Sequence, residues 1–309
     1  MSATMPTTTR GGAFEVAGTA ADPRHQPRSR RPARPSLLPT VVLLVGALYC
    51  LLPVAWVVVA STKTRAELFT TFSFAPGLNG GLFDNVRELS AYNDGQFWLW
   101  GLNSLLYAAV GAGLSAGVSA TAGFALAKYR FVGRQVMFNI LLAGVLVPQV
   151  ALAIPQYLLL ARTGLAGSYW SVLLPGVISP FGIYLCRIYA AAAVPDEALE
   201  AARIDGAGEF RAFRSIAMPM MVPGLVTVFL LQFVGVWNNF LLPYVMLTDA
   251  DKFPLTVGLY SLLAQGSDRP ALYTLVVTGV VLATLPLLAL FLLLQRYWRL
   301  DLVSGGLKG

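Results

Sequence analysis

Long apolar blocks alternate with short polar segments along the whole chain, and the charged residues are confined to the polar segments. Six stretches lack Asp, Glu, Lys and Arg over more than about 18 residues, which is the length an α-helix needs to cross a hydrocarbon core of roughly 30 Å. They lie at 35–62, 101–127, 135–161, 163–186, 220–245 and 271–294. The pattern predicts an all-α polytopic membrane bundle of six transmembrane helices.

The ends of the chain differ from this body. Residues 1–36 are rich in Thr, Gly, Pro and Arg, and we expect them to form a disordered cytoplasmic tail. A signal peptide is the alternative, but the apolar block that follows is too long for one and no small-residue cleavage pattern follows it. We therefore expect a transmembrane domain at 37–299 and a cytoplasmic C-terminal tail at 300–309.

Basic residues predict the orientation of the spans. With the N-terminus placed inside, 16 of the 22 Lys and Arg residues fall in cytoplasmic segments and 6 fall outside. Because cytoplasmic loops carry the excess of Lys and Arg, we expect both termini to be cytoplasmic in a multi-pass protein of the cell membrane.

Composition excludes most soluble classes. Of the 309 residues, 56% are hydrophobic and 12% are charged, against about 25% charged in a soluble domain. The net charge is +7, but the spans divide the basic residues among short loops and tails, so we expect a lipid bilayer and no nucleic acid as the partner of these charges.

Few residues are suited to catalysis. His25 is the only histidine and lies in the N-terminal tail, while Cys50 and Cys186 lie inside apolar blocks. We therefore expect no catalytic residue, no metal site and no disulfide framework. The chain also lacks the G-x-x-x-x-G-K-[ST] phosphate loop, so it does not bind ATP by that device.

Two connections are long enough to carry function. The predicted outside loop 62–100 holds Trp98 and Trp100 near its re-entry, where aromatic rings favour the membrane interface. The predicted inside loop 187–219 is more informative. Pro195 suits the start of a helix that runs to Gly206, a suitable left-handed stop.

After Gly208 we expect a second short helix that places Phe210, Phe213, Ile216 and Ala217 on one face and ends near Pro219. Taken from the residues alone, this helix–turn–helix is either an amphipathic cover for the bundle ends or a docking element for another protein. The small side chains of Ala201 and Ala202 favour close approach of a partner.

The spacing within this loop resembles the EAA motif of permease subunits from binding-protein-dependent ABC importers. The pattern is Glu-Ala-Ala, Gly, then Ile-x-Leu-Pro, with Met218 in place of the usual Leu. The matching positions are Glu200, Ala201, Ala202, Gly206, Ile216 and Pro219.

Further segments are similar to the carbohydrate-uptake, maltose-type branch of that family, whose permeases have six spans. These segments are Asp205, the sequence Leu-Asn-Ser at 102–104, Trp-Asn-Asn-Phe-Leu-Leu-Pro at 237–243, and the C-terminal residues from Gln295. The resemblance covers roughly residues 37–309, and the first 36 residues have no recognisable counterpart in it.

The resemblance implies a type I ABC importer permease that moves a sugar together with a second permease subunit. It also implies two cytoplasmic ATP-binding subunits and an extracytoplasmic solute-binding protein. The chain itself then carries no cofactor, because ATP binds the partner subunits. The residues expected to couple it to the ATPases are Glu200, Ala201, Ala202, Asp205, Gly206, Ile216 and Pro219.

Neutral polar residues in the spans are candidates for a translocation path, because sugars are bound by such groups and by aromatic faces. The candidates are Gln232, Trp237, Asn238, Asn239 and Gln149. Hydrogen bonding between helices is the alternative role for each of them. Pro148 and Pro155 are expected to kink the third span, and Gly113 with Gly117 to pack closely against a neighbouring helix.

Three other functions remain open. One is an ABC permease for a non-sugar solute such as glycerol phosphate or a polyamine. The second is an ion-coupled secondary transporter, which the expected absence of Asp, Glu, Lys, Arg and His from every span disfavours. The third is a structural membrane scaffold.

Overall fold

The structure is a computed structural model that describes residues 37–266 and 269–305. These residues form helices and connecting turns, with no β-strand among them. The predicted all-α fold is therefore confirmed for this part of the chain. The predicted tail 1–36, with His25, and residues 306–309 lie outside the described residues.

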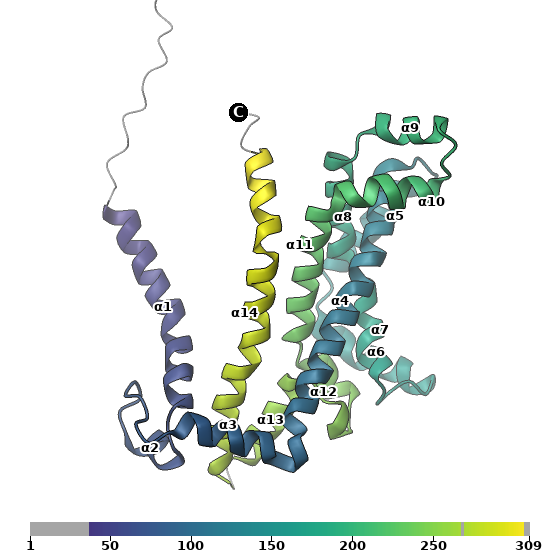
Figure 1. Cartoon of the computed structure of the whole chain (residues 1–309). Helices are drawn as coiled ribbons and strands as arrows, with labels where there is room; N and C mark the ends of the chain where they lie inside the picture. The colour runs from purple at the N-terminus through teal and green to yellow at the C-terminus, as the bar shows by residue number, and fades with distance from the viewer. Residues whose placement is uncertain (1–36, 267–268, 306–309) are drawn as a thin grey trace, which may run out of the picture. The chain divides into compact units, whose positions relative to one another are not determined.

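The chain divides into two compact units, Met1–Cys50 and Leu51–Gly309. The described part of the first unit is the N-terminal half of helix α1 (Leu37–Ser61), whose large apolar side chains are exposed. The elements described below belong to the second unit (Figure 1).

The second unit is built from helices joined by short turns. In chain order they are α2 (Arg65–Thr70), α3 (Gly81–Ala91), α4 (Gln96–Lys128), α5 (Arg134–Val145), α6 (Gln149–Arg162), α7 (Tyr169–Val177), α8 (Pro180–Ala193), α9 (Asp196–Ile204), α10 (Glu209–Ala212), α11 (Met218–Trp237), α12 (Leu241–Met246), α13 (Leu255–Gln265) and α14 (Ala271–Gly305).

Helix α4 is the central element and packs against α7, α8 and α11. Its close approach to α8 depends on Gly123, where an added Cβ would lie 2.5 Å from the Cβ of Cys186. The predicted close packing at Gly113 and Gly117 does not occur within this chain, since an added Cβ at either position meets no atom within 4 Å. Small residues on a different face of α4 make the contact instead.

The third predicted span is broken rather than merely kinked. Helices α5 and α6 meet at an angle of 103°, and Pro148 stands immediately before α6. Proline has no amide donor and disfavours a helical conformation in the residue before it, so the helix stops there. Pro155 lies within α6, which continues through it to Arg162.

The fourth predicted span is also bent, by 42° between α7 and α8. The Ser179 hydroxyl accepts a hydrogen bond from the Gly182 amide at 3.0 Å, and Pro180 opens α8, so a new helix begins there. Helix α8 continues to Ala193, beyond the predicted end of the fourth span at residue 186, and contains Arg187. The Arg187 guanidinium lies 3.7 Å from the centroid of the Phe138 ring.

By length and composition, four helical stretches in the described part of the chain can cross a membrane, and counting each bent pair as one span gives up to six. The fifth predicted span is shorter than expected, because α11 ends at Trp237 and the separate helix α12 follows. Helix α14 continues to Gly305, beyond the expected boundary at Arg299.

The segment 62–100 is structured. It contains α2 and α3, and α4 already begins at Gln96. Trp98 is exposed, but Trp100 is only 2% exposed, and its ring packs against Gly258 of α13. The prediction that both tryptophans lie at the membrane interface was therefore wrong for Trp100, whose side chain belongs to the core.

Candidate functional site

A helical hairpin, residues 196–217, projects at one end of the second unit (Figure 1). Its first arm is α9, which begins after Pro195 with two acidic residues in its first turn. Gly206 has φ +79°, as predicted for a left-handed stop. The Gly206 amide donates to the Arg203 carbonyl at 3.0 Å and the Ala207 amide to the Ala202 carbonyl at 2.9 Å, so α9 ends in a Schellman motif.

The second arm joins the hairpin to the next long helix without a break. Helix α10 passes through a π-helical turn, Phe213–Ala217, into α11. Pro219 lies in the first turn of α11, directly after the π-helical turn. The expected grouping of Phe210 with Phe213 was wrong, because Phe213 is buried and Phe210 is 74% exposed.

The predicted coupling residues divide between two faces of the hairpin. Ala202 is buried and Ile216 is partly buried, both in an apolar cluster with Phe124 of α4 and Cys186 of α8. The exposed members are Glu200, Ala201, Asp205, Gly206 and Pro219. Of the two alanines, only Ala201 is therefore accessible to another protein.

The exposed side of the hairpin also carries apolar groups. Ile204 is 86% exposed and Phe210 is 74% exposed, on either side of the Gly206 turn. Large apolar side chains next to an acidic residue and a small one form a surface suited to contact with another protein. One face of the hairpin therefore packs into the apolar cluster, and the other face exposes apolar side chains.

Ion pairs and hydrogen bonds attach the hairpin to the C-terminal end of α4. The Lys128 ammonium donates to Asp196 Oδ1 at 2.7 Å, and the Tyr129 hydroxyl donates to Glu209 Oε2 at 2.6 Å. Arg203 joins the two arms, since its Nε and Nη2 donate to the two Glu209 carboxylate oxygens at 2.9 and 3.2 Å. Both arms are thus attached to α4 and one arm to the other.

These contacts shift the ionisation of the groups involved. The hydrogen bond from Lys128, and then its charge, lowers the pKa of Asp196 below the ordinary value. Hydrogen bonds from Arg203 and Tyr129 lower the pKa of Glu209. Burial, and then the bond to Glu209, raises the pKa of Tyr129 to about 12. At neutral pH both carboxylates are therefore charged and the Tyr129 hydroxyl keeps its proton.

Sequence reasoning missed Lys128 and Tyr129 as part of this site. They lie 68 and 80 residues before their partners, so spacing does not reveal the pairs. The available signal was a charged and an aromatic residue at the predicted end of a span, beside a loop rich in acidic residues.

The N-terminal end of α4 holds a different segment, the loop 250–255. Four side chains spaced three and four residues apart lie on one face of the helix and bind the backbone of this loop; they are Trp100, Asn103, Ser104 and Tyr107. The carbonyls of residues 250, 251, 252 and 253 each accept one bond from these α4 side chains, at 2.7–3.1 Å. The Leu255 amide donates to the Ser104 hydroxyl at 2.7 Å.

Asn103 is the centre of that contact. It is 4% exposed, and its amide nitrogen donates to the carbonyls of Asp251 and Phe253. Its oxygen accepts a bond from the Tyr169 hydroxyl at 3.1 Å. The side chain thus joins α4, α7 and the loop at one point.

Two of the predicted path residues lie away from the others. The Gln232 amide donates to the Ser179 hydroxyl at the bend between α7 and α8, which is the interhelical role considered as the alternative. Gln149 is the first residue of α6 and is exposed at the 103° break. Neither residue lines the pocket described next.

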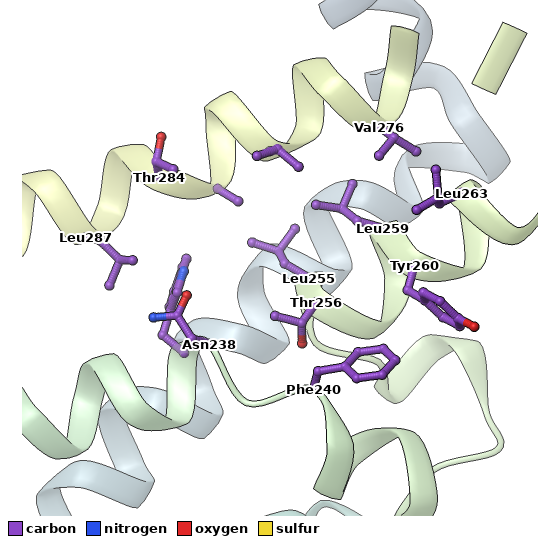
Figure 2. Close-up of a pocket in the computed structure, with 13 residues that line it drawn as sticks. Asn238, Phe240, Leu255, Thr256, Leu259, Tyr260, Leu263, Val276, Thr284 and Leu287 are labelled. Carbon is purple, nitrogen blue, oxygen red and sulfur yellow. The ribbon is translucent and has the colours of Figure 1, made fainter. Parts of the chain in front are cut away.

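Trp237 and Asn238 line a pocket of about 430 Å³ between α13, α14 and the end of α11 (Figure 2). Trp237 is 5% exposed and stacks on Phe233 with ring centroids 5.8 Å apart. Asn238 is exposed, and its amide donates to the Val234 carbonyl. Asn239 joins neighbouring segments. Its side-chain oxygen accepts a hydrogen bond from the Leu242 amide, and its carbonyl accepts one from the Thr256 hydroxyl.

Three aromatic rings gather beside this pocket. Phe240 and Tyr260 line it, with ring centroids 4.9 Å apart, and Tyr244 stacks on Phe240 at 5.1 Å. Tyr244 is 50% exposed and Tyr260 is 43% exposed. Aromatic faces next to a few polar groups are common in small-molecule sites. Sequence reasoning missed Tyr244, which lies on α12, and Tyr260, which lies on the separate helix α13.

No group of three or more His, Cys, Asp or Glu side chains is placed to hold a metal ion within the ranges 37–266 and 269–305. The two cysteines in these ranges, exposed Cys50 and buried Cys186, are free thiols. The described residues offer an exposed hairpin surface and a pocket.

Comparison with known proteins agrees with this geometry. The arabinooligosaccharide transport system permease protein AraQ of Halalkalibacterium halodurans is 33% identical over 277 residues, which are 89% of this chain and 97% of the relative. The lactose transport system permease protein LacG of Rhizobium radiobacter is 32% identical, over 85% of this chain and 93% of the relative.

A solved structure shares the fold. It is a chain from a bacterial ABC transporter involved in the import of the acidic polysaccharide alginate, similar with a TM-score of 0.74 and 25% identity, over 84% of this chain and 95% of that one. The family model for the inner membrane component of binding-protein-dependent transport systems matches residues 113–299. The chain belongs to that family and is a multi-pass membrane component of an ABC transport system.

Proposed function

We propose that this chain is a permease subunit of an ATP-driven importer that moves a sugar, as a mono- or oligosaccharide, across the cytoplasmic membrane into the cell. It forms the pathway with a second permease, and an extracytoplasmic solute-binding protein delivers the sugar. Two cytoplasmic ATP-binding subunits supply the energy, so this chain binds no ATP and catalyses no reaction.

The hairpin 196–217 is the observation that carries the proposal. Its exposed edge presents Glu200, Ala201 and the Gly206 turn, and its buried edge packs onto the helices that continue through the unit. A displacement applied to the hairpin therefore reaches α4, α8 and α11. The proposal places the hairpin on the cytoplasmic side, where the ATP-binding subunits dock.

The orientation follows from that placement. Figure 1 shows the C-terminal end of α14 at the same end of the second unit as the hairpin. A cytoplasmic hairpin thus implies a cytoplasmic C-terminus, and the basic-residue count favours the same side for the N-terminus. The binding protein then meets the opposite end, which carries α2, α3 and the loop 250–255.

The sugar is supported by the relatives and by the pocket. The AraQ relative is named for arabinooligosaccharide transport and the LacG relative for lactose transport, and the pocket beside Asn238 combines aromatic rings with few polar groups. We place Trp237, Asn238 and Tyr260 along the path. Gln232 and Asn239 stabilise the helices around the path. Gln232 bonds to Ser179, and Asn239 bonds to Leu242 and Thr256.

Uptake by the reconstituted complex tests the substrate class. The chain, its second permease, the ATP-binding subunits and the binding protein are placed in liposomes and supplied with arabinooligosaccharides, lactose, glycerol phosphate or a polyamine. ATP-dependent uptake of a sugar is expected. Uptake of only glycerol phosphate or polyamine would replace the substrate assignment. Uptake by this chain alone under a H⁺ or Na⁺ gradient would replace the ATP-driven mechanism.

Gly206 tests the coupling role. Substituting Gly206→Glu places a side chain at φ +79°, where L-residues other than Asn and Asp are strained, and adds bulk to the docking edge. We expect the variant to insert into the membrane but to lose substrate-stimulated ATPase activity and uptake. Gly206→Asn, which tolerates the left-handed conformation, is the matched control and retains more activity. Normal stimulation in the Glu variant would defeat the coupling role.

A further inference from the structure

Helix α4 is attached to a functional segment at each end. At its C-terminus Lys128 and Tyr129 bind the hairpin through Asp196 and Glu209. At its N-terminus four side chains bind the backbone of the loop 250–255. The helix has 33 residues, which at 1.5 Å per residue is about 50 Å, and it contains no proline. It is therefore a long element without the commonest cause of a helix kink.

We propose that Lys128 and Tyr129 are positioning residues that fix the hairpin to α4, so that displacement of the hairpin moves α4 as one body with it and reaches the loop 250–255. This inference rests on the proposed function, in which ATP-binding subunits displace the hairpin. It assigns the route by which that displacement crosses the membrane-spanning part of the chain.

The burial of the two α4 residues supports a mechanical role. The Lys128 side chain is only 8% exposed, while that of its partner Asp196 is 74% exposed, so the lysine is held by α4 and reaches outward to the hairpin. The Tyr129 ring packs edge-on against Phe124, with centroids 5.6 Å apart, and Phe124 in turn contacts Phe213 of the hairpin. Both donors are therefore fixed in direction before they meet their partners.

The apolar cluster beneath the hairpin does not replace this attachment. Leu199, Ala202 and Phe213 lie in one apolar cluster with side chains of α4, α8 and α11, and apolar contacts allow sliding because they have no preferred direction. The bonds to Asp196 and Glu209 connect to α4 alone and are directional. They attach the hairpin to α4, which is the one of these three helices that does not adjoin the hairpin along the chain.

The energetic coupling is measured as sugar molecules imported per ATP hydrolysed by the complete reconstituted complex. Lys128→Met and Tyr129→Phe each remove one bond while keeping side-chain size. We expect each variant to continue hydrolysing ATP while the ratio falls by about fivefold, the lower end of typical coupling factors. The exchanged pair Lys128→Glu with Asp196→Lys is expected to restore most of the ratio, because it restores an ion pair between α4 and the hairpin.

A matched control removes a similar ion pair elsewhere. Arg65→Met deletes the exposed pair with Glu88, whose nitrogen and oxygen are 3.4 Å apart, at the opposite end of the unit. The ratio is expected to stay unchanged in this variant. Melting temperatures of all variant complexes show that loss of coupling is not loss of folding.

A distance measurement tests the inference independently of sugar transport. Spin labels at Glu197→Cys on α9 and Leu114→Cys on α4, with Cys50→Ser to remove the exposed thiol, report the hairpin–α4 distance with and without nucleotide. We expect one narrow distance that nucleotide leaves unchanged, and a broadened one when Lys128→Met is added.

Different outcomes would contradict the attachment of the hairpin to α4 and the proposed function. A nucleotide-dependent distance in the unsubstituted pair, or a ratio that survives both Lys128→Met and Tyr129→Phe, would overturn the inference. Failure of the exchanged pair to recover the ratio would also overturn it. Failure of the unsubstituted complex to import any sugar would contradict the proposed function instead, while the distance measurement still decides whether hairpin and α4 move together.

Discussion

The two ends of helix α4 hold their neighbours by different physical means. At the N-terminal end, buried side chains bind backbone atoms of the loop 250–255, and Trp100, Asn103 and Tyr107 are each at most 4% exposed. At the C-terminal end, the partners Asp196 and Glu209 are exposed carboxylates. Both ends are well bonded, but only one is sealed from solvent.

This difference in burial predicts that the two ends of α4 contribute unequally to the free energy of unfolding. A buried polar group that loses its partner costs about 1–3 kcal/mol, whereas an exposed ion pair contributes about 0–1 kcal/mol. The loop end is therefore expected to stay fixed through the transport cycle. The hairpin end is expected to contribute less to the free energy of unfolding, because its carboxylate partners are exposed.

The largest expected effect comes from filling the space against Trp100. In Gly258→Leu the new Cβ would lie 2.2 Å from the Trp100 ring, which its bond to the Ala250 carbonyl holds in place. Overpacking of this kind costs about 3 kcal/mol. Thermal unfolding of the purified complex measures it. Gly113→Leu is the matched control, since no atom lies within 4 Å of its new Cβ.

That control also sharpens the comparison. An unchanged melting temperature for Gly113→Leu is expected for this chain by itself. A loss of assembly with the second permease at unchanged chain stability would place the exposed face of α4 at the contact between the two permeases. A melting temperature as low as that of Gly258→Leu would contradict the packing described above.

The next effect in size is at Asn103. Asn103→Ala leaves the carbonyls of Asp251 and Phe253 and the Tyr169 hydroxyl without this partner, which costs about 2 kcal/mol. We expect a clear drop in melting temperature and faster hydrogen exchange of the loop 250–255. Asn79→Ala removes an exposed bond to Glu67 at 2.8 Å and serves as the control. Equal drops in both variants would erase the distinction between the two ends.

A smaller effect on stability is expected at Glu209. Glu209→Gln weakens the bonds to Arg203 and Tyr129, but the Arg203 and Glu209 side chains are exposed. We expect the melting temperature to change by less than the drop in Asn103→Ala, because exposed pairs contribute little. Calorimetry of the two variant complexes makes the comparison. A larger drop for Glu209→Gln would show that the hairpin end carries the stability.

The smallest effect is expected from pH. The pKa values of Asp196 and Glu209 are lowered in the folded chain, so their contribution is present above the ordinary carboxyl pKa of about 4 and is lost as pH falls through the lowered values. Tyr129 has a raised pKa, so its contribution is complete below about 10 and is lost as pH rises through about 12.

The hairpin–α4 distance should therefore be constant between about pH 6 and 9, which is above the carboxyl pKa values and below the pKa of Tyr129. Histidine ordinarily titrates at about 6.5, but the only histidine, His25, lies outside the described residues. The spin-labelled pair reports it directly. A transition with a midpoint inside this range would mean that a group other than these three controls the attachment.

Much of the fold was readable from local signals. An apolar block long enough to cross a membrane predicts a span, however the helices pack. Gly206 predicts a left-handed helix stop because it has no Cβ. The breaks in the third and fourth spans were harder to predict. A proline within an apolar block can be tolerated, as Pro155 is, or can precede a sharp bend, as Pro148 does, depending on whether neighbouring groups satisfy the freed carbonyls.

The candidate site was predicted only in part. The motif residues of the hairpin are contiguous, so spacing located Glu200 and Gly206. Spacing did not separate exposed Ala201 from buried Ala202, because that depends on which face of α9 meets α4 and α8. The aromatic group of Phe240, Tyr244 and Tyr260 likewise needs two helices to meet.

The sequence by itself determined that the chain is a membrane bundle with one structured hairpin between its fourth and fifth apolar blocks, because hydropathy, glycine geometry and motif spacing act within a few turns of one helix. Only the tertiary structure decided which of those residues are anchors and which are exposed. Bonds such as Lys128 to Asp196 and Asn103 to Asp251 join positions far apart in sequence, and their energies depend on burial, which exists only once the helices have packed.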